Sequence, residues 1–187
     1  SRGLGDVYKR QDNYYRDDNG TSTTSGNVAA ALNYAASKNF PIVNISLAIS
    51  GSVPDVAAAA DALASTGGLM VFGAGNVGGA EPASTSLVTS TNRNNIIFVG
   101  GLDAASLEEY ALYPNSNKAG SFADRYLVTS YQATAVSAGT GETTYQVWGT
   151  SYSAPMVAGA AALLLQKWPQ LSGAQAGQIL LDTAKDI

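Results

Sequence analysis

The sequence contains no cysteine and no histidine, and these absences exclude several kinds of chemistry. Without cysteine the chain cannot form disulfides, thiolate metal sites or a thiol nucleophile. Without histidine a zinc site would need carboxylates alone, which zinc proteins rarely use. A serine nucleophile would likewise find no imidazole base within these 187 residues.

Charged side chains are also scarce. They make up 13% of the sequence against 45% hydrophobic residues, which is typical of a globular protein with a weakly charged surface. A net charge of -4 and the lack of a basic cluster argue against a nucleic-acid or anionic-membrane partner. The longest apolar run, residues 154–165, is too short to cross a bilayer and indicates a buried core helix.

The remaining apolar residues follow helical and strand patterns in alternation. Helical patterns cover residues 26–38 and 54–65, a third helix runs from just after Ser151 to about Lys167, and the last begins after Ser172. Apolar strands are expected at 42–47, 69–72 and 96–99, with weaker patterns at 126–129 and 145–148. Strands of this kind between helices predict one α/β domain, a three-layer sandwich around a mostly parallel sheet.

The first residues, SRGLGDVYKRQ, show no apolar periodicity. They resemble a translated sequencing adapter, and an ordinary frayed terminus is the alternative. We expect residues 1–11 to be a non-native tail and residues 12–187 to belong to one domain.

A glycine-rich segment, GAGNVG at 73–78, matches the dinucleotide-binding pattern G-x-G-x-x-G. That pattern needs a helix opening within it, and residues 79–82 show no helical periodicity. Alternatively, Asn76 turns its amide N–H into the crevice at the end of the preceding strand, as an oxyanion donor that cannot titrate. Taken alone, the segment favours the simpler interpretation that Asn76 only adopts a left-handed turn among glycines.

The segment GTSYSAP at 149–155 places Ser151 just before a predicted helix whose first turn would contain Pro155. Free N–H groups and the helix dipole would stabilise negative charge that develops beside Ser151. Gly149 and the small residues after the serine leave room for a substrate. Taken alone, the segment is equally compatible with serine and threonine residues that only cap the helix.

Four segments together resemble the subtilisin-like serine proteases, or subtilases. They are IVNISLAISG at 42–51, LMVFGAGN at 69–76, NIIFVGGLDA at 95–104 and GTSYSAPMVAGAAALLLQKWP at 149–169, in the order of the family. SNKAG at 116–120 and the C-terminal segment are most similar to subtilase domains of bacterial autotransporters. The resemblance implies a subtilisin-like fold, N-terminally truncated, with residues 12–187 as the C-terminal part of one catalytic domain.

The resemblance also implies roles for individual residues. Ser151 would be the nucleophile, and Asn76 would form the oxyanion hole with the Ser151 backbone N–H. The substrate cleft would be lined by residues at two strand ends, with Ala48 in place of the usual glycine: Ser46, Leu47, Ala48, Gly73, Ala74 and Gly75.

The implied partner is a protein or peptide substrate, and the implied location is outside the cell or on the bacterial cell surface. In an autotransporter, the full-length protein would add a β-barrel translocator domain. No cofactor is implied, and the structural calcium that some members bind cannot be assigned to residues from this sequence.

The missing histidine leaves three interpretations. In the first, the catalytic Asp and His precede residue 12 in the parent protein, and this chain is inactive as it stands. In the second, the chain is an inert subtilase-like binding module. In the third, it is a serine-carboxyl peptidase, which would need an aspartate at position 76 and acids on the helix at 26–38, and it has neither. We expect the first, because an inert module would not need both Ser151 and Asn76.

Overall fold

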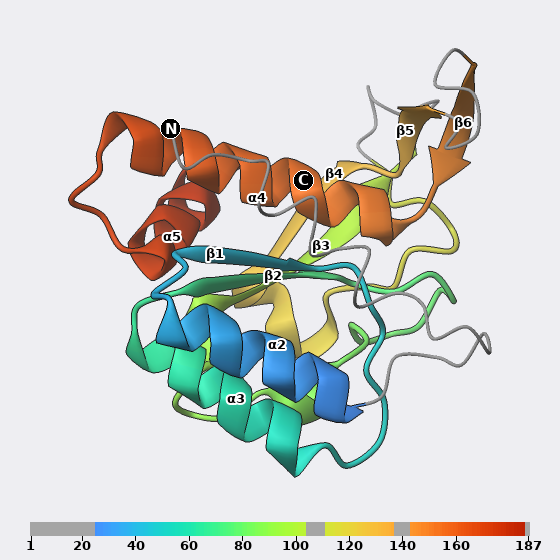
Figure 1. Ribbon diagram of the computed structural model, residues 1–187. Coiled ribbons are helices and arrows are strands. Elements are labelled where there is room, and N and C mark those ends of the chain that lie inside the picture. Colours follow the sequence, from blue (N-terminus) through green and yellow to red (C-terminus); the bar gives the residue numbers. More distant parts are fainter. Residues whose placement is uncertain (1–24, 104–110, 137–142, 186–187) are drawn as a thin grey trace.

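Four parallel strands in the order β1-β2-β3-β4 form the centre of the structure. The computed structural model describes residues 25–103, 111–136 and 143–185. The strands are β1 (Ile42–Ile45), β2 (Leu69–Gly73), β3 (Ile96–Leu102) and β4 (Tyr126–Ser130). One face is covered by α2 (Ser25–Ser37) and α3 (Pro54–Ser65), and the other by α4 (Thr150–Lys167) and α5 (Gly173–Thr183) (Figure 1). The predicted α/β sandwich with a parallel sheet is confirmed.

An antiparallel hairpin leads into α4 and projects beyond the sheet (Figure 1). It consists of β5 (Gln132–Val136) and β6 (Thr144–Trp148), and β5 is absent from the sequence-based prediction. Short 3-10 turns lie at Thr85–Leu87, Arg93–Asn95 and Gly120–Arg125. Among the described residues β1 pairs only with β2 and β4 only with β3, so both are edge strands. The expected tail at residues 1–11 lies outside the described part.

The central strands have no exposed side, which explains their uninterrupted apolar sequences. In β2 and β3, Met70 and Phe98 belong to the core beneath α2 and α3, while Val71 and Ile97 belong to the core beneath α4 and α5. Alternate side chains of a strand point to opposite faces of the sheet, so a strand buried on both faces is apolar at every position. The resulting rigid sheet fixes the positions of the loops at its carboxyl edge.

One side of α4 is not covered by any described residue. We expected a helix buried on nearly every face, but only the side toward the sheet is buried, through residues such as Ala154, Val157 and Ala161. The opposite side, which we call the α4 outer stripe, consists of Tyr152, Met156, Gly159 and Leu163. Met156 is 41% and Leu163 67% exposed.

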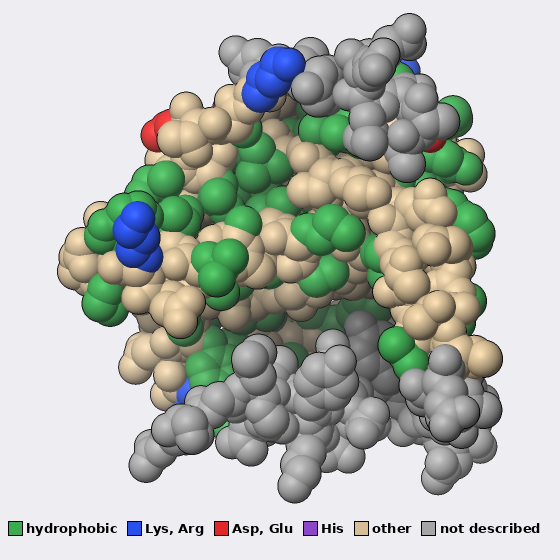
Figure 2. All heavy atoms as spheres, turned by 90° about the horizontal axis from the view of Figure 1, so that it is seen from above, with side chains coloured by type: hydrophobic (Ala, Val, Ile, Leu, Met, Phe, Trp, Pro, Cys, Tyr) green, Lys and Arg blue, Asp and Glu red, His purple; other side chains and the backbone are tan. Residues whose placement is uncertain are grey.

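Figure 2 looks onto the α4 side and shows hydrophobic side chains at this surface. On this face the hydrophobic side chains lie among backbone and polar atoms. No helix in the described part of the chain is long and apolar enough to cross a membrane.

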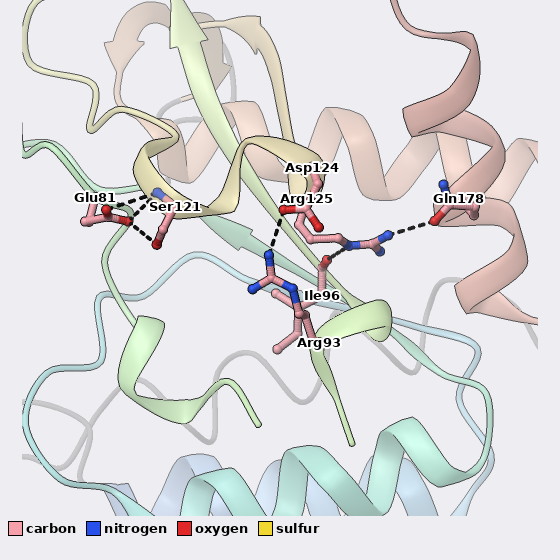
Figure 3. A network of polar contacts seen from close by, with 7 residues as sticks. All are labelled: Glu81, Arg93, Ile96, Ser121, Asp124, Arg125 and Gln178. Atoms are coloured by element: carbon pink, nitrogen blue, oxygen red, sulfur yellow. Dashed lines mark hydrogen bonds and ion pairs between the residues drawn. The ribbon is translucent and has the colours of Figure 1, made fainter. Parts of the chain in front are cut away.

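A buried arginine ties α5 to the sheet (Figure 3). Arg125 donates to the carbonyl oxygens of Ile96 and Asn94 at 3.0 and 2.8 Å, and to Gln178 Oε1 at 2.8 Å. Burial lowers the pKa of Arg125, because a charged group loses hydration inside the protein. Nearby, the partly exposed ion pair between Arg93 and Asp124 adds little stability. This network is structural, since its donors point at backbone and side-chain oxygens of the fold.

Candidate active site

The candidate site lies where β1 and β2 end and α4 begins. Ser46 follows β1 directly, and its hydroxyl donates to the Ser151 carbonyl oxygen at 2.8 Å. In return, the Ser151 hydroxyl lies 3.5 Å from the Ser46 carbonyl oxygen. Residues 105 positions apart in the sequence are thus in contact at the carboxyl edge of the sheet, where α/β proteins bind ligands.

Pro155 explains why Ser46 is bound to the helix. The sequence predicted Pro155 in the first turn, with Ser151 just before the helix, but α4 already begins at Thr150 and Pro155 lies inside it. A proline has no N–H, so it cannot donate to the carbonyl four residues earlier, which is that of Ser151. The Ser46 hydroxyl supplies the missing hydrogen bond and thereby links β1 to the segment that carries Ser151.

Asn76 is fixed beside Ser151 through its amide oxygen. Asn76 Oδ1 accepts hydrogen bonds from the Thr150 backbone N–H at 2.8 Å and from the Thr150 hydroxyl at 3.1 Å. With the oxygen held in this way, the Nδ2 group is the part of the amide that can donate to another molecule. Asn76 is exposed, so this donor is accessible to a ligand.

Thr150 is the residue whose importance the sequence did not reveal. The N-cap of α4 is Gly149, so Thr150 is the first residue of the helix and not its cap. It is buried and instead accepts a hydrogen bond from the Gly75 N–H at 3.0 Å, while it donates to Asn76. The one sequence signal for Thr150 was its position directly before Ser151. Threonine is also common at this position when it only caps a helix, so the signal did not separate the two roles.

Gly149 makes the sharp entry into α4 possible. Its φ of 139° lies in a region that residues with a side chain rarely adopt. Its N–H donates to the Tyr131 carbonyl at 2.9 Å, and a Cβ at this position would lie 3.4 Å from Asn76 Nδ2. A glycine here keeps the space beside the Asn76 amide free.

The six expected cleft residues differ in what they present to a ligand. Ser46 and Gly75 are half-buried and Ala48 is exposed at the candidate site. Leu47 packs against the hydrophobic core, and Ala74 is fully buried. Gly73 is also buried, and a Cβ there would lie 3.0 Å from the Thr150 carbonyl oxygen. Contact between these residues and a substrate remains a prediction.

The dinucleotide-binding alternative finds no support at 73–78. After β2 the chain continues as a loop, and the next element is the short 3-10 turn Thr85–Leu87. The helix N-terminus that would hold a pyrophosphate is therefore missing after this strand. Among the described residues, no three acidic side chains come together in a way that could hold a metal ion.

The fold and the site together define the class of protein. A serine in the first turn of a helix, beside an amide whose oxygen is held, is one arrangement that places a nucleophile next to an oxyanion donor. The model of the subtilase family matches residues 4–187, so the chain belongs to the subtilase family of serine proteases. The resemblance inferred from the four sequence segments is confirmed at the level of the family.

Individual relatives agree with this assignment. The chain is 36% identical over 132 residues to the autotransporter lipoprotein NalP of Neisseria meningitidis serogroup B, an alignment that covers 64% of this chain and 12% of NalP. The maturation protease PagA is similar in fold, with a TM-score of 0.77 and 17% identity over 92% of this chain and 62% of PagA. Sphericase is also similar in fold, with a TM-score of 0.73 and 22% identity, and the match covers 87% of this chain and 56% of the sphericase chain. The chain thus spans only part of each relative.

Proposed function

We propose that residues 12–187 form the C-terminal part of the catalytic domain of a subtilase-type serine endopeptidase. In this proposal Ser151 is the nucleophile, and the oxyanion hole consists of Asn76 Nδ2 and the Ser151 backbone N–H. The general base is a histidine outside these 187 residues, because the sequence contains none. The chain alone is therefore expected to be inactive as a peptidase.

The observation that carries the proposal is the pair of hydrogen bonds from Thr150 to Asn76 Oδ1, at 2.8 and 3.1 Å. These two bonds fix the orientation of the Asn76 amide next to Ser151. An oxyanion donor requires such an orientation, because its N–H must already point at the position where negative charge develops. Ser151, in the first turn of α4, has a backbone N–H without an intrahelical acceptor, which supplies a second donor.

The reaction follows from these positions. The Ser151 hydroxyl attacks the carbonyl carbon of the scissile peptide, and its proton passes to the external base. The carbonyl oxygen becomes an oxyanion held by the two N–H donors. When the carbon–nitrogen bond breaks, the base returns the proton to the leaving amine, and an acyl group remains on Ser151. Water then attacks the ester carbonyl while the base takes its proton, and the base returns this proton to Ser151 Oγ as the carbon–oxygen bond breaks and the acid product leaves.

We further propose that the parent protein acts on proteins or peptides outside the cell or on the bacterial surface. Support comes from the similarity to NalP, whose name describes an autotransporter lipoprotein. The net charge of -4 gives no reason to expect a nucleic-acid partner.

The proposal can be tested by supplying the base from solution. The chain is incubated with a serine-reactive fluorophosphonate, with and without imidazole, and the labelled residue is located by mass spectrometry. Without imidazole we expect only background labelling. With imidazole, labelling of Ser151 should rise with the concentration of the neutral form, because this form takes the hydroxyl proton. In subtilisin itself, loss of the oxyanion asparagine costs about 10²–10³-fold in kcat. We likewise expect Asn76→Ala to lower the rate of the imidazole-dependent labelling.

A matched control lies two residues away. Ser153 is fully buried and its hydroxyl donates to the Ser130 carbonyl at 2.9 Å, so Ser153→Ala should leave the labelling rate unchanged. Ser151→Ala should abolish it. Labelling that imidazole does not increase, or that is spread over several serines, would refute the catalytic assignment and favour an inert binding module. Efficient labelling without imidazole would refute the external base.

A further inference from the structure

The loop that carries Asn76 is built around the side chain of Asn117. Asn117 is only 5% exposed, and its Oδ1 accepts hydrogen bonds from the Val77 N–H at 3.1 Å and the Gly79 N–H at 3.0 Å. Its Nδ2 donates to the Glu81 carbonyl oxygen at 3.1 Å. One side chain therefore bonds to three backbone groups of the segment 77–81, which has no regular secondary structure.

The backbone beside Asn117 holds the same loop. The Asn117 N–H donates to the Gly75 carbonyl at 3.0 Å, and the Lys118 N–H donates to the Gly79 carbonyl at 2.8 Å. The Tyr126 hydroxyl in turn donates to the Asn117 carbonyl. Burial raises the pKa of Tyr126, so this phenol keeps its proton and remains a donor at neutral pH. Asn117 is thus anchored to β4 as well as to the loop.

Two glycines show how closely the loop encloses this side chain. A Cβ on Gly75 would lie 2.7 Å from Asn117 Nδ2, and one on Gly79 would lie 3.0 Å from the same atom. Gly75 also has a positive φ of 111°. Any larger residue at either position would displace the Asn117 side chain. Glycine at positions 75 and 79 therefore leaves the room that this side chain occupies.

Asn76 has little else to hold it from this side. Its neighbour Val77 is 86% exposed, so no apolar packing fixes the turn. The loop is instead attached to Thr150 through the Asn76 amide oxygen and to the Asn117 side chain through the peptide groups that follow. It is also attached to the Asn115 carbonyl oxygen, which accepts from the Gly78 N–H at 2.8 Å. A side-chain amide whose backbone can move would lose the alignment of its N–H, even with Thr150 in place.

We propose that Asn117 is a positioning residue for the Asn76 donor, and this inference rests on the proposed function of Asn76. Asn117 touches neither Ser151 nor the substrate; it fixes the backbone of the loop so that Asn76 Nδ2 points at the oxyanion site. The segment SNKAG at 116–120, which indicates the autotransporter-type subtilases in the sequence, thereby gains a physical role.

The test measures the mobility of the Asn76 side-chain amide by NMR in the 15N-labelled 187-residue chain, with Asn76→Asp used to assign its signals. In the wild type we expect an order parameter near the rigid-backbone value of about 0.85, and in Asn117→Ala a fall below about 0.6. Asn117→Asp keeps the acceptor for Val77 and Gly79 but loses the donor to the Glu81 carbonyl oxygen, so it should restore the order only in part. The Val77 N–H should also exchange slowly with solvent in the wild type, although the residue is exposed.

Asn92 supplies the matched control. It is fully buried, accepts from the Thr89 N–H at 2.9 Å and donates to the Leu87 carbonyl at 3.0 Å, on the other side of the sheet from α4. Asn92→Ala removes equivalent hydrogen bonds and should lower stability without changing the Asn76 signal. An equal change in both alanine variants, or none in Asn117→Ala, would overturn the proposal. Rapid exchange of the wild-type Val77 N–H would overturn it even if Asn117→Ala failed to fold.

A kinetic measurement separates this proposal from the function of the site. If Asn117 acts through Asn76, Asn117→Ala alone should lower the rate of imidazole-dependent labelling of Ser151. In a chain that already carries Asn76→Ala, the same substitution should lower this rate no further. Additive losses would contradict the positioning role. Absence of labelling in every variant, together with the expected NMR result, would refute only the catalytic function, because the mobility of Asn76 is measured without any reaction.

Discussion

Replacement of Thr150 by valine is the sharpest test of how the site is built. Valine keeps the size and branching of threonine but lacks the hydroxyl. The Gly75 N–H, now 3.0 Å from the hydroxyl, would lose its acceptor at a half-buried position, which costs about 1–3 kcal/mol. Asn76 Oδ1 would lose one of its two donors, worth about 1 kcal/mol. Thr150→Val should therefore destabilise the chain by about 2–4 kcal/mol.

Thr150→Ser is the matched control for this experiment. Serine keeps the hydroxyl and loses one buried methyl group, which costs about 0.8 kcal/mol. The free energy of unfolding is measured by urea denaturation followed by circular dichroism. With a slope of about 1–3 kcal/mol per molar urea, the valine variant should unfold roughly 1 M earlier than the serine variant. Equal midpoints for the two variants would show that the hydroxyl does not fix the loop, and the interpretation of Asn76 would lose its main support.

Three further predictions concern other parts of the structure. Ser46→Ala should lower the free energy of unfolding by about 1 kcal/mol. The loss should be smaller in a Pro155→Ala background, because the residue 155 N–H can then donate to the Ser151 carbonyl itself. Urea unfolding with and without Ser46→Ala, in each background, measures the difference. Leu163 is 67% exposed, so Leu163→Gln should leave the free energy of unfolding unchanged in urea denaturation, whereas Ala161→Gln at a fully buried position of the same helix should lower it. The raised pKa of Tyr126 stabilises the fold below the unfolded value of about 10, and this contribution disappears as the pH rises through the folded value. Tyr126→Phe should therefore lose less stability than the wild type between about pH 8 and pH 11.

The fold could be predicted because its main elements have strong local signals. The central strands are apolar at every position, and α3 begins at a proline and ends before two glycines, so its predicted and observed bounds agree at residues 54–65. The hairpin strand β5 escaped detection because QATAV has few large apolar residues and is partly exposed. Its pairing with β6 depends on a partner that its own sequence does not specify.

The candidate site was predictable in part. Ser151 and Asn76 stand in recognisable motifs at a helix start and a strand end. Thr150 and Asn117 also lie in segments that resemble the family, but their roles could not be assigned, because these come from contacts with residues about 75 and 40 positions away in the sequence. The sequence also misplaced Pro155, since the start of α4 depends on the Asn76 amide that receives the Thr150 N–H. Such contacts arise only when distant segments fold against one another.

The hydrogen bond from Ser46 to the helix has a consequence for how the segment with Ser151 is supported. Ser46 directly follows β1, an edge strand whose outer side has no partner strand among the described residues. A strand that docks on this edge would restrain Ser46, and through its hydroxyl the turn that carries Ser151. A single side chain, Ser46, thus connects the free edge of the sheet to the segment that carries Ser151, so support added at this edge would extend to the candidate site.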